Sequence, residues 1–206
     1  MKREFRLSLP HGHLDAALEL PEAPRGVVLW ASLHAAFGPG SVVATAPALG
    51  FAGIALRLLN TQEAGFADSA HNTPLLAERL LAALDWLARD ADTAGLPLAL
   101  LAEAAVTPAA IRVAASRDRQ VQCLVCHGGL PDGAGRQYLE WLRAPLLMLA
   151  DASDQASVAR FSRVQALLGG PSELRVLPGG HGPDRQVLEW MARHLATAAG
   201  DPATSA

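Results

Sequence analysis

The chain has 206 residues, which is long enough for one well-buried domain and short for two. Half of its residues are apolar and its formal net charge is -3, so the composition excludes a disordered chain and gives no basic surface for nucleic acid. No apolar run is long enough to cross a bilayer and the N-terminus does not read as a signal peptide, so we expect a cytoplasmic protein without membrane or nucleic-acid partners.

The N-terminal part of the chain predicts two antiparallel strands. Residues 4–9 and 13–20 are rich in β-forming patterns, and Pro10-His11-Gly12 between them is a hairpin signal. From residue 26 onward, short continuous apolar runs recur that are typical of strands buried on both faces of a parallel sheet. These runs are 26–30, 53–59, 96–101, 121–125, 145–149 and 173–177. The sequence therefore predicts eight strands.

Helical patterns lie between these runs. The clearest is the apolar stripe from Leu76 to Leu87, which follows Thr73-Pro74, a helix cap and a proline at the first helical position. Further helices are expected at 41–49, 108–116, 154–168 and 187–195, whereas residues 60–72 read as a surface loop.

The alternation of strand and helix predicts the α/β class. We expect a three-layer α/β/α sandwich around a mostly parallel eight-stranded sheet with an antiparallel N-terminal hairpin. It forms a single domain over residues 1–198, and residues 199–206 form a flexible tail. Cys123 and Cys126 lie three residues apart in one strand, so their side chains should point to opposite faces and form no redox pair.

Ligands of open α/β sheets bind beyond the carboxyl ends of the strands, so the residues that follow each apolar run are the candidates for a site. They are Ser32, Leu33 and His34, then Glu103, Ala104 and Ala105, then Cys126 and His127, then Asp151, Ser153 and Asp154, and last His181.

The order of these features resembles the α/β-hydrolase superfamily, in particular small bacterial proteins similar to dienelactone hydrolase. The likeness covers nearly the whole chain, from Leu14 to about Leu195, and its most specific parts are the segments 76–87, 94–97 and 128–132. The resemblance implies the α/β-hydrolase fold and a Ser-His-acid triad.

The matching residues depart from that triad. The superfamily holds its nucleophile in a Gly-x-Ser-x-Gly elbow. The corresponding stretch here is Ala102-Glu103-Ala104-Ala105-Val106, which has Ala104 at the serine position and neither glycine. Alanine carries no lone pair that can attack a carbonyl group. The joint loss of the serine and both glycines favours natural erosion of the site over an engineered substitution.

The other positions implied by the resemblance can be matched one at a time. Ser32-Leu33 stand where the oxyanion side usually carries a His-Gly pair. The acid position falls on Ser153, with Asp151 and Asp154 on either side, and His181 alone retains the base. A degenerate triad of this kind makes the usual serine mechanism untenable.

Three functions fit these residues. The first is a pseudoenzyme that serves as a ligand-binding or protein-interaction scaffold. The second is an active ester or dienelactone-type hydrolase with a non-standard nucleophile, for which the candidates are Ser32, Glu103, Cys126 and Ser153, and with His181 or His34 as its base.

The third is a metal pocket, which would draw on the histidines and carboxylates at the strand ends: His34, His127 and His181 with Glu103 or Asp151. None of these residues has a local metal-binding spacing, so our prediction is no metal and no cofactor. His71 precedes the helix that begins at Thr73 and could reach over the pocket as part of a lid. A small-molecule ligand and a homodimer are both compatible with the sequence, which identifies neither a substrate nor a partner.

Overall fold

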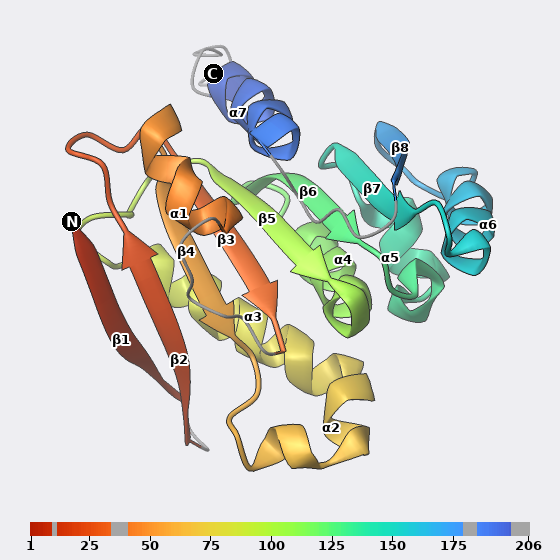
Figure 1. Cartoon of the computed structure of the whole chain (residues 1–206), viewed down its shortest axis with the longest axis horizontal. Helices are drawn as coiled ribbons and strands as arrows, with labels where there is room; N and C mark the ends of the chain where they lie inside the picture. Colours follow the sequence, from red (N-terminus) through yellow and green to blue (C-terminus); the bar gives the residue numbers. More distant parts are fainter. Residues whose placement is uncertain (10–11, 34–40, 179–184, 199–206) are drawn as a thin grey trace, which may run out of the picture.

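A computed structural model describes residues 1–9, 12–33, 41–178 and 185–198, and within them the eight predicted strands form one sheet (Figure 1). The strands are β1 (Lys2–Leu9), β2 (Gly12–Glu19), β3 (Val27–Ser32), β4 (Ala52–Arg57), β5 (Leu98–Glu103), β6 (Val121–His127), β7 (Leu146–Asp151) and β8 (Ser172–Leu177). Their order is β1-β2-β4-β3-β5-β6-β7-β8. The hairpin β1–β2 and the pair β2–β4 are antiparallel, and every other neighbouring pair is parallel, as predicted.

Helices cover both faces of this sheet, which confirms the three-layer prediction (Figure 1). They are α1 (Val42–Thr45), α2 (Ala67–His71), α3 (Thr73–Leu87), α4 (Thr107–Ser116), α5 (Arg136–Trp141), α6 (Gln155–Gln165) and α7 (Arg185–Ala198). Short 3₁₀ turns are η1 (Ala46–Leu49), η2 (Glu63–Gly65), η3 (Ala104–Val106) and η4 (Pro131–Ala134).

Two layers of apolar side chains hold the helices to the sheet. The larger layer lies under α3, α4, α5 and α6, and the smaller lies under α1 and α7. Cys126 belongs to the larger layer and Cys123 to the smaller, so the prediction that the two thiols point to opposite faces is confirmed. Both cysteines are free and buried.

Residues 60–72 are not the irregular loop that we predicted, because they contain η2 and α2. Turns of this length are too short to show a periodic apolar stripe. An ion pair anchors the segment: Arg79 of α3 donates to both carboxylate oxygens of Glu63 and also to the carbonyl oxygen of Leu58, at 2.6 Å. Similarly, the helix expected at 41–49 is divided into α1 and η1, where Pro47 lies at the start of the second turn.

None of the described helices is both long and apolar enough to span a membrane. Residues 199–206, which we predict to be a flexible tail, lie outside the described part of the chain.

Candidate functional site

A sharp strand-to-helix turn joins β5 to α4 at the carboxyl edge of the sheet. Ala104 stands at its apex with a φ of 48°, and it is the one non-glycine residue with positive φ in the described part of the chain. An alanine in this left-handed region costs roughly 1–2 kcal/mol, and such strain persists only where the surroundings impose it. This is the strand-turn-helix geometry of a nucleophile elbow. The turn therefore has the backbone geometry of such an elbow, with Ala104 at its apex.

The two glycines that follow β6 hold this turn in place. Gly129 has a φ of +89°, and a Cβ atom there would lie 2.0 Å from the carbonyl oxygen of Ala104. The buried Thr107, at the start of α4, donates its Oγ1 to the carbonyl oxygen of Gly128 at 2.9 Å. Our reading of the sequence missed this role, although two consecutive glycines directly after a strand are a signal of a close backbone approach.

The apex of the elbow is open. Ala104 is exposed, and its neighbours Glu103 and Ala105 are half-buried. Within the ranges that the structure describes, no bulky side chain therefore seals the position that a serine hydroxyl would occupy. An uncovered apex is what a ligand site requires, whereas a filled one would have favoured a purely structural role.

Several of the predicted site residues share this edge of the sheet. Glu103 and His127 end β5 and β6 and stand opposite each other in the parallel register, and Asp151 ends β7. The residues two positions before them, 101, 125 and 149, pack in the layer under α7. Since alternate residues of a strand share a face, the three polar side chains lie on that face. Ser32, at the end of β3, lies two residues after Trp30, which packs in the layer under α7, so Ser32 shares that face. Leu33 packs against the opposite layer.

Cys126 does not line this site, so our prediction of it as a pocket residue and alternative nucleophile was wrong. Its position in β6 directs the side chain into the layer under α4, where it is fully buried. Burial raises the pKa of the Cys126 thiol to about 12, against a small lowering by Thr107. A nucleophilic cysteine needs an accessible thiolate, and this residue has neither access nor charge.

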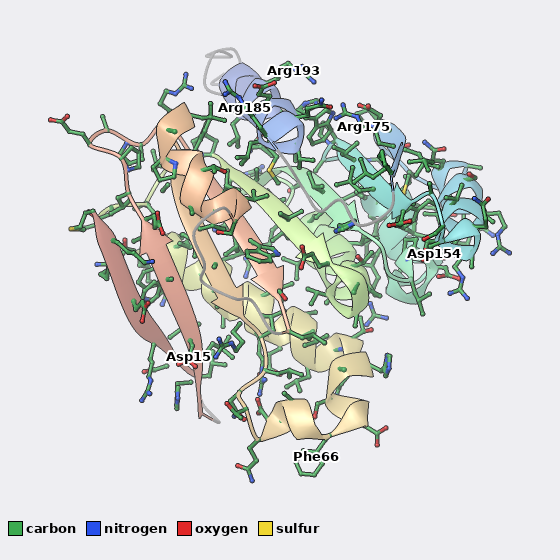
Figure 2. The ribbon with its side chains drawn as sticks, viewed as in Figure 1. Asp15, Phe66, Asp154, Arg175, Arg185 and Arg193 are labelled. Atoms are coloured by element: carbon green, nitrogen blue, oxygen red, sulfur yellow. The ribbon has the colours of Figure 1, made fainter. Side chains whose placement is uncertain are left out.

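The turn between β7 and α6 assigns different roles to the residues around the acid position. Asp151 accepts hydrogen bonds from both the backbone N–H and the hydroxyl of Ser153, at 2.7 and 2.5 Å. Asp154 caps α6 by accepting hydrogen bonds from the hydroxyl and the backbone N–H of Ser157. These two bonds, of which the hydroxyl bond has the larger effect, hold the pKa of Asp154 below its usual value. Figure 2 places Asp154 beside α6. Asp151 is therefore the carboxylate on the site's face, and Asp154 is a helix cap.

Other predicted site residues cannot be assigned in this way. His34 and His181 lie outside the described residues. His71 is exposed at the end of α2, a helix that lies beside η3, so its role in a lid stays a prediction. In the described ranges, no three His, Cys, Asp or Glu side chains converge on a point that could hold a metal ion.

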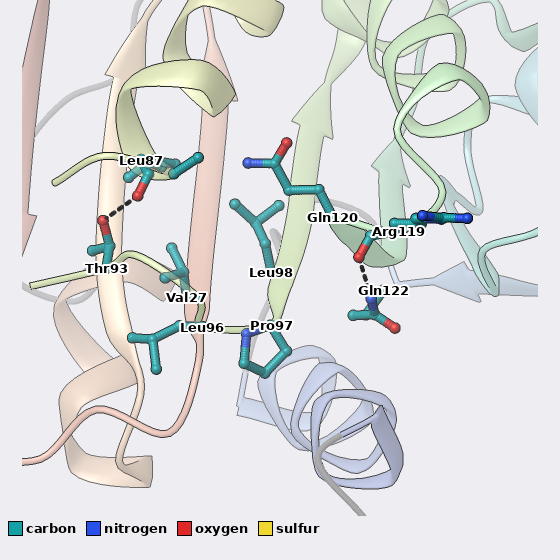
Figure 3. A pocket seen from close by; sticks show the side chains of 11 residues that line it. Val27, Leu87, Thr93, Leu96, Pro97, Leu98, Arg119, Gln120 and Gln122 are labelled. Carbon is teal, nitrogen blue, oxygen red and sulfur yellow. Dashed lines mark hydrogen bonds between the residues drawn. The ribbon is translucent and has the colours of Figure 1, made fainter. Parts of the chain in front are cut away.

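A separate open depression of about 490 Å³ lies at the opposite, amino end of the central strands (Figure 3). Most of its polar side chains bond within the chain: Thr93 donates to the carbonyl of Leu87, and Gln122 to that of Arg119, both at 2.9 Å. Gln120 donates to the carbonyl of Leu84 at 2.8 Å. Three of the four polar side chains that line the depression thus donate within the chain, and the fourth is that of Arg119. The elbow remains the candidate site, because it lies at the carboxyl edge of the sheet, where ligands of this fold class bind.

Comparison with known structures agrees with the fold. A dienelactone hydrolase from Anabaena variabilis superposes with a TM-score of 0.78 over 97% of this chain and 95% of its own, at 24% sequence identity. An α/β serine hydrolase without a lid from Xanthomonas campestris superposes with a TM-score of 0.63, at 20% identity over 99% of this chain and 97% of its own. The chain has the α/β-hydrolase fold.

Comparison of sequences gives a different relative. No protein-family model matches the chain. A proposed phosphoribosyl transferase of Mycobacterium tuberculosis, found in two strains, is 33% identical over 177 residues, which make up 82% of this chain. The chain spans only 38% of the length of this relative.

Proposed function

We propose that the protein binds a small carbonyl compound at the elbow and has lost serine-hydrolase catalysis. The observation that carries the proposal is the exposed methyl group of Ala104 at the apex of an intact elbow. Loss of the nucleophile removes the covalent step of acyl transfer and costs several orders of magnitude in rate. The rest of the elbow depends on backbone geometry, which the alanine leaves unchanged.

The ligand's chemistry follows from the groups around the apex. Neither η3 nor α4 has a side-chain cap from a described residue, so amide N–H groups at the start of this helical segment, such as that of Ala105, can donate to a ligand oxygen. The carboxylates of Glu103 and Asp151 share the edge of the sheet and oppose an anion there. We therefore infer an uncharged carbonyl compound, such as an ester, that is bound and released intact.

The test uses the whole chain in three forms: wild type, Ala104→Ser and Ala105→Ser. A fluorophosphonate probe and a series of esters of increasing acyl length report on nucleophilic activity, and mass spectrometry locates any adduct. We expect no labelling or turnover in the wild type and labelling of the new serine in Ala104→Ser. Ala105→Ser is the matched control, because it adds the same hydroxyl one residue away from the apex, and it should stay unlabelled.

Binding is measured separately by ligand-observed NMR with the same esters. We expect binding to the wild type and its loss in Ala104→Leu, whose larger side chain fills the space above the apex. Ester turnover by the wild type that disappears in His181→Ala would contradict the proposal and favour a hydrolase with another nucleophile, Ser32, Ser153 or Glu103. A cytoplasmic location stays part of the proposal and is checked by fractionation.

A second candidate ligand comes from the sequence relative, whose name refers to a phosphoribosyl group. The 33% sequence identity supports this ligand. The carboxylates of Glu103 and Asp151 at the strand ends count against it, because they repel a phosphate group. Ribose 5-phosphate therefore belongs in the NMR series. Binding of this compound, blocked by Ala104→Leu and without binding of any ester, would favour the second candidate.

A further inference from the structure

The strand β8 forms one edge of the sheet, and it has no partner strand on its outer side among the described residues (Figure 1). Along the strand, the backbone N–H and C=O groups of successive residues point alternately toward β7 and away from it. The carbonyl groups of Pro171 and Leu177 accept hydrogen bonds from Leu146 of β7 and from Ala152 directly after it, at 2.9 and 2.8 Å. By the alternation of a parallel ladder, the backbone N–H and C=O groups of residues 172, 174 and 176 face outward. Such an edge is a template for another strand.

We propose that two copies of this chain associate through β8, with the two strands antiparallel across a twofold axis at Leu174. In this register the outward groups of Leu174 bond to those of its symmetry mate. Ser172 likewise bonds to Val176 of the second copy. The contact would also cover the side chain of Val176, which is 48% exposed. The interface is isologous, as a closed dimer requires.

Charge fixes the register. Glu173 and Arg175 lie between the outward-facing residues and share the face toward α7, where Arg175 Nε donates to Glu173 Oε1 at 2.7 Å. Trp190 of α7 donates to the other oxygen of Glu173 at 3.1 Å, which orients the carboxylate. An axis at Leu174 places each Glu173 opposite Arg175 of the second copy. These are non-hydrogen-bonded pairs, whose Cα atoms approach to about 4.5 Å.

Neighbouring registers lose this complementarity. An axis at position 173 places two glutamates opposite each other, and an axis at position 175 does the same with two arginines. Like charges directly opposite each other destabilise an antiparallel pair. The charge pattern of the strand therefore selects the axis at Leu174.

The other edge of the sheet, β1, is less suited to self-pairing. It carries three cations and one anion: Lys2, Arg3, Arg6 and Glu4. Two copies would bring an excess of positive charge together, and several of these cations already bond within the chain, such as Arg3 to Asp90 at 2.9 Å. Charged residues of this kind protect a sheet edge from association. We therefore expect association to stop at two copies.

The experiment measures the mass of the whole chain by sedimentation velocity and light scattering over a wide range of concentration. The wild type should form a dimer. Glu173→Arg and Arg175→Glu should each weaken association by about ten- to a hundredfold, because each places like charges opposite each other at two symmetric positions. Arg6→Glu, at the centre of β1, is the matched control and should leave the dimer unchanged.

Mixing the two single variants gives the decisive result. Glu173 of one variant then faces Arg175 of the other, and the two introduced charges also face each other with opposite sign. We expect a heterodimer from two monomeric proteins, which a folding defect in either variant could not produce. A wild type that stays monomeric at every concentration would overturn the proposal. A dimer that neither single variant weakens, or a mixture that fails to associate, would also overturn it.

Discussion

Two strand-to-helix turns at the same edge of the sheet are held by different forces. The turn from β5 to α4 has no side-chain cap, and close backbone contact with Gly129 holds Ala104 in its strained conformation. The turn from β7 to α6 is held by side-chain hydrogen bonds of Asp151 and Asp154. The first turn keeps its shape with a simple methyl group at its apex. The second turn uses its carboxylates to keep its shape.

The strongest test of this contrast is Gly129→Ala. A Cβ atom 2.0 Å from the Ala104 carbonyl oxygen forces two backbone segments apart, and we expect a loss of about 4 kcal/mol or more in the free energy of unfolding. Chemical denaturation measures it. Gly128→Ala is the matched control. Its φ is also positive, at +66°, but nothing lies within 4 Å, so it should cost only roughly 1–2 kcal/mol. Equal losses in the two variants would show that contact with Gly129 does not hold the elbow.

A smaller effect is expected from Thr107→Val. The substitution keeps the shape of the side chain but removes the hydrogen bond to Gly128, leaving a carbonyl oxygen without its partner. We expect a loss of about 1–3 kcal/mol, measured by the same denaturation. Thr107→Ser retains the hydroxyl and separates the hydrogen bond from the methyl group. If Thr107→Val loses no more unfolding free energy than Thr107→Ser, the hydrogen bond to Gly128 does not stabilise the elbow.

The second turn should respond to pH. The pKa of Asp154 is lowered in the folded chain, so its contribution to stability is present at neutral pH and is lost as the pH falls below about 4. Asp154→Asn keeps a side chain that caps helices well but does not titrate. We expect the melting temperature of the wild type to fall more between pH 7 and pH 3 than that of the Asn variant. Parallel curves would contradict this account of the turn.

The smallest expected effect is the absence of a reaction. Burial raises the pKa of both Cys123 and Cys126 to about 12, so neither thiol should be alkylated by iodoacetamide in the native chain near neutral pH. Both should react fully after denaturation, as mass spectrometry can count. Rapid labelling of Cys126 alone would show that the elbow opens, since this residue packs against Thr107.

The sequence predicts the sheet better than the site. Apolar runs located six of the eight strands, because strands buried on both faces need continuous apolar side chains, and β-rich patterns around a hairpin signal located the other two. The same periodicity could not detect α2 or η2, which are too short for a stripe. The resemblance to the α/β-hydrolase superfamily placed Ala104 at the elbow, but it could not show the backbone conformation there, because φ at this alanine depends on contact with Gly129, which is distant in sequence. Alternation along β6 directs Cys126 and His127 to opposite faces of the sheet, so only one of these two neighbours can face the site.

The close approach of Gly129 to the elbow has a genetic consequence. Codons for alanine and serine differ by a single base, so one point mutation at position 104 returns a hydroxyl group to the apex. The glycine has no such freedom, since any side chain there meets the carbonyl of Ala104. A gene of this kind can thus lose or regain a nucleophile in one step, as long as a different residue, 25 positions further along the chain, never changes.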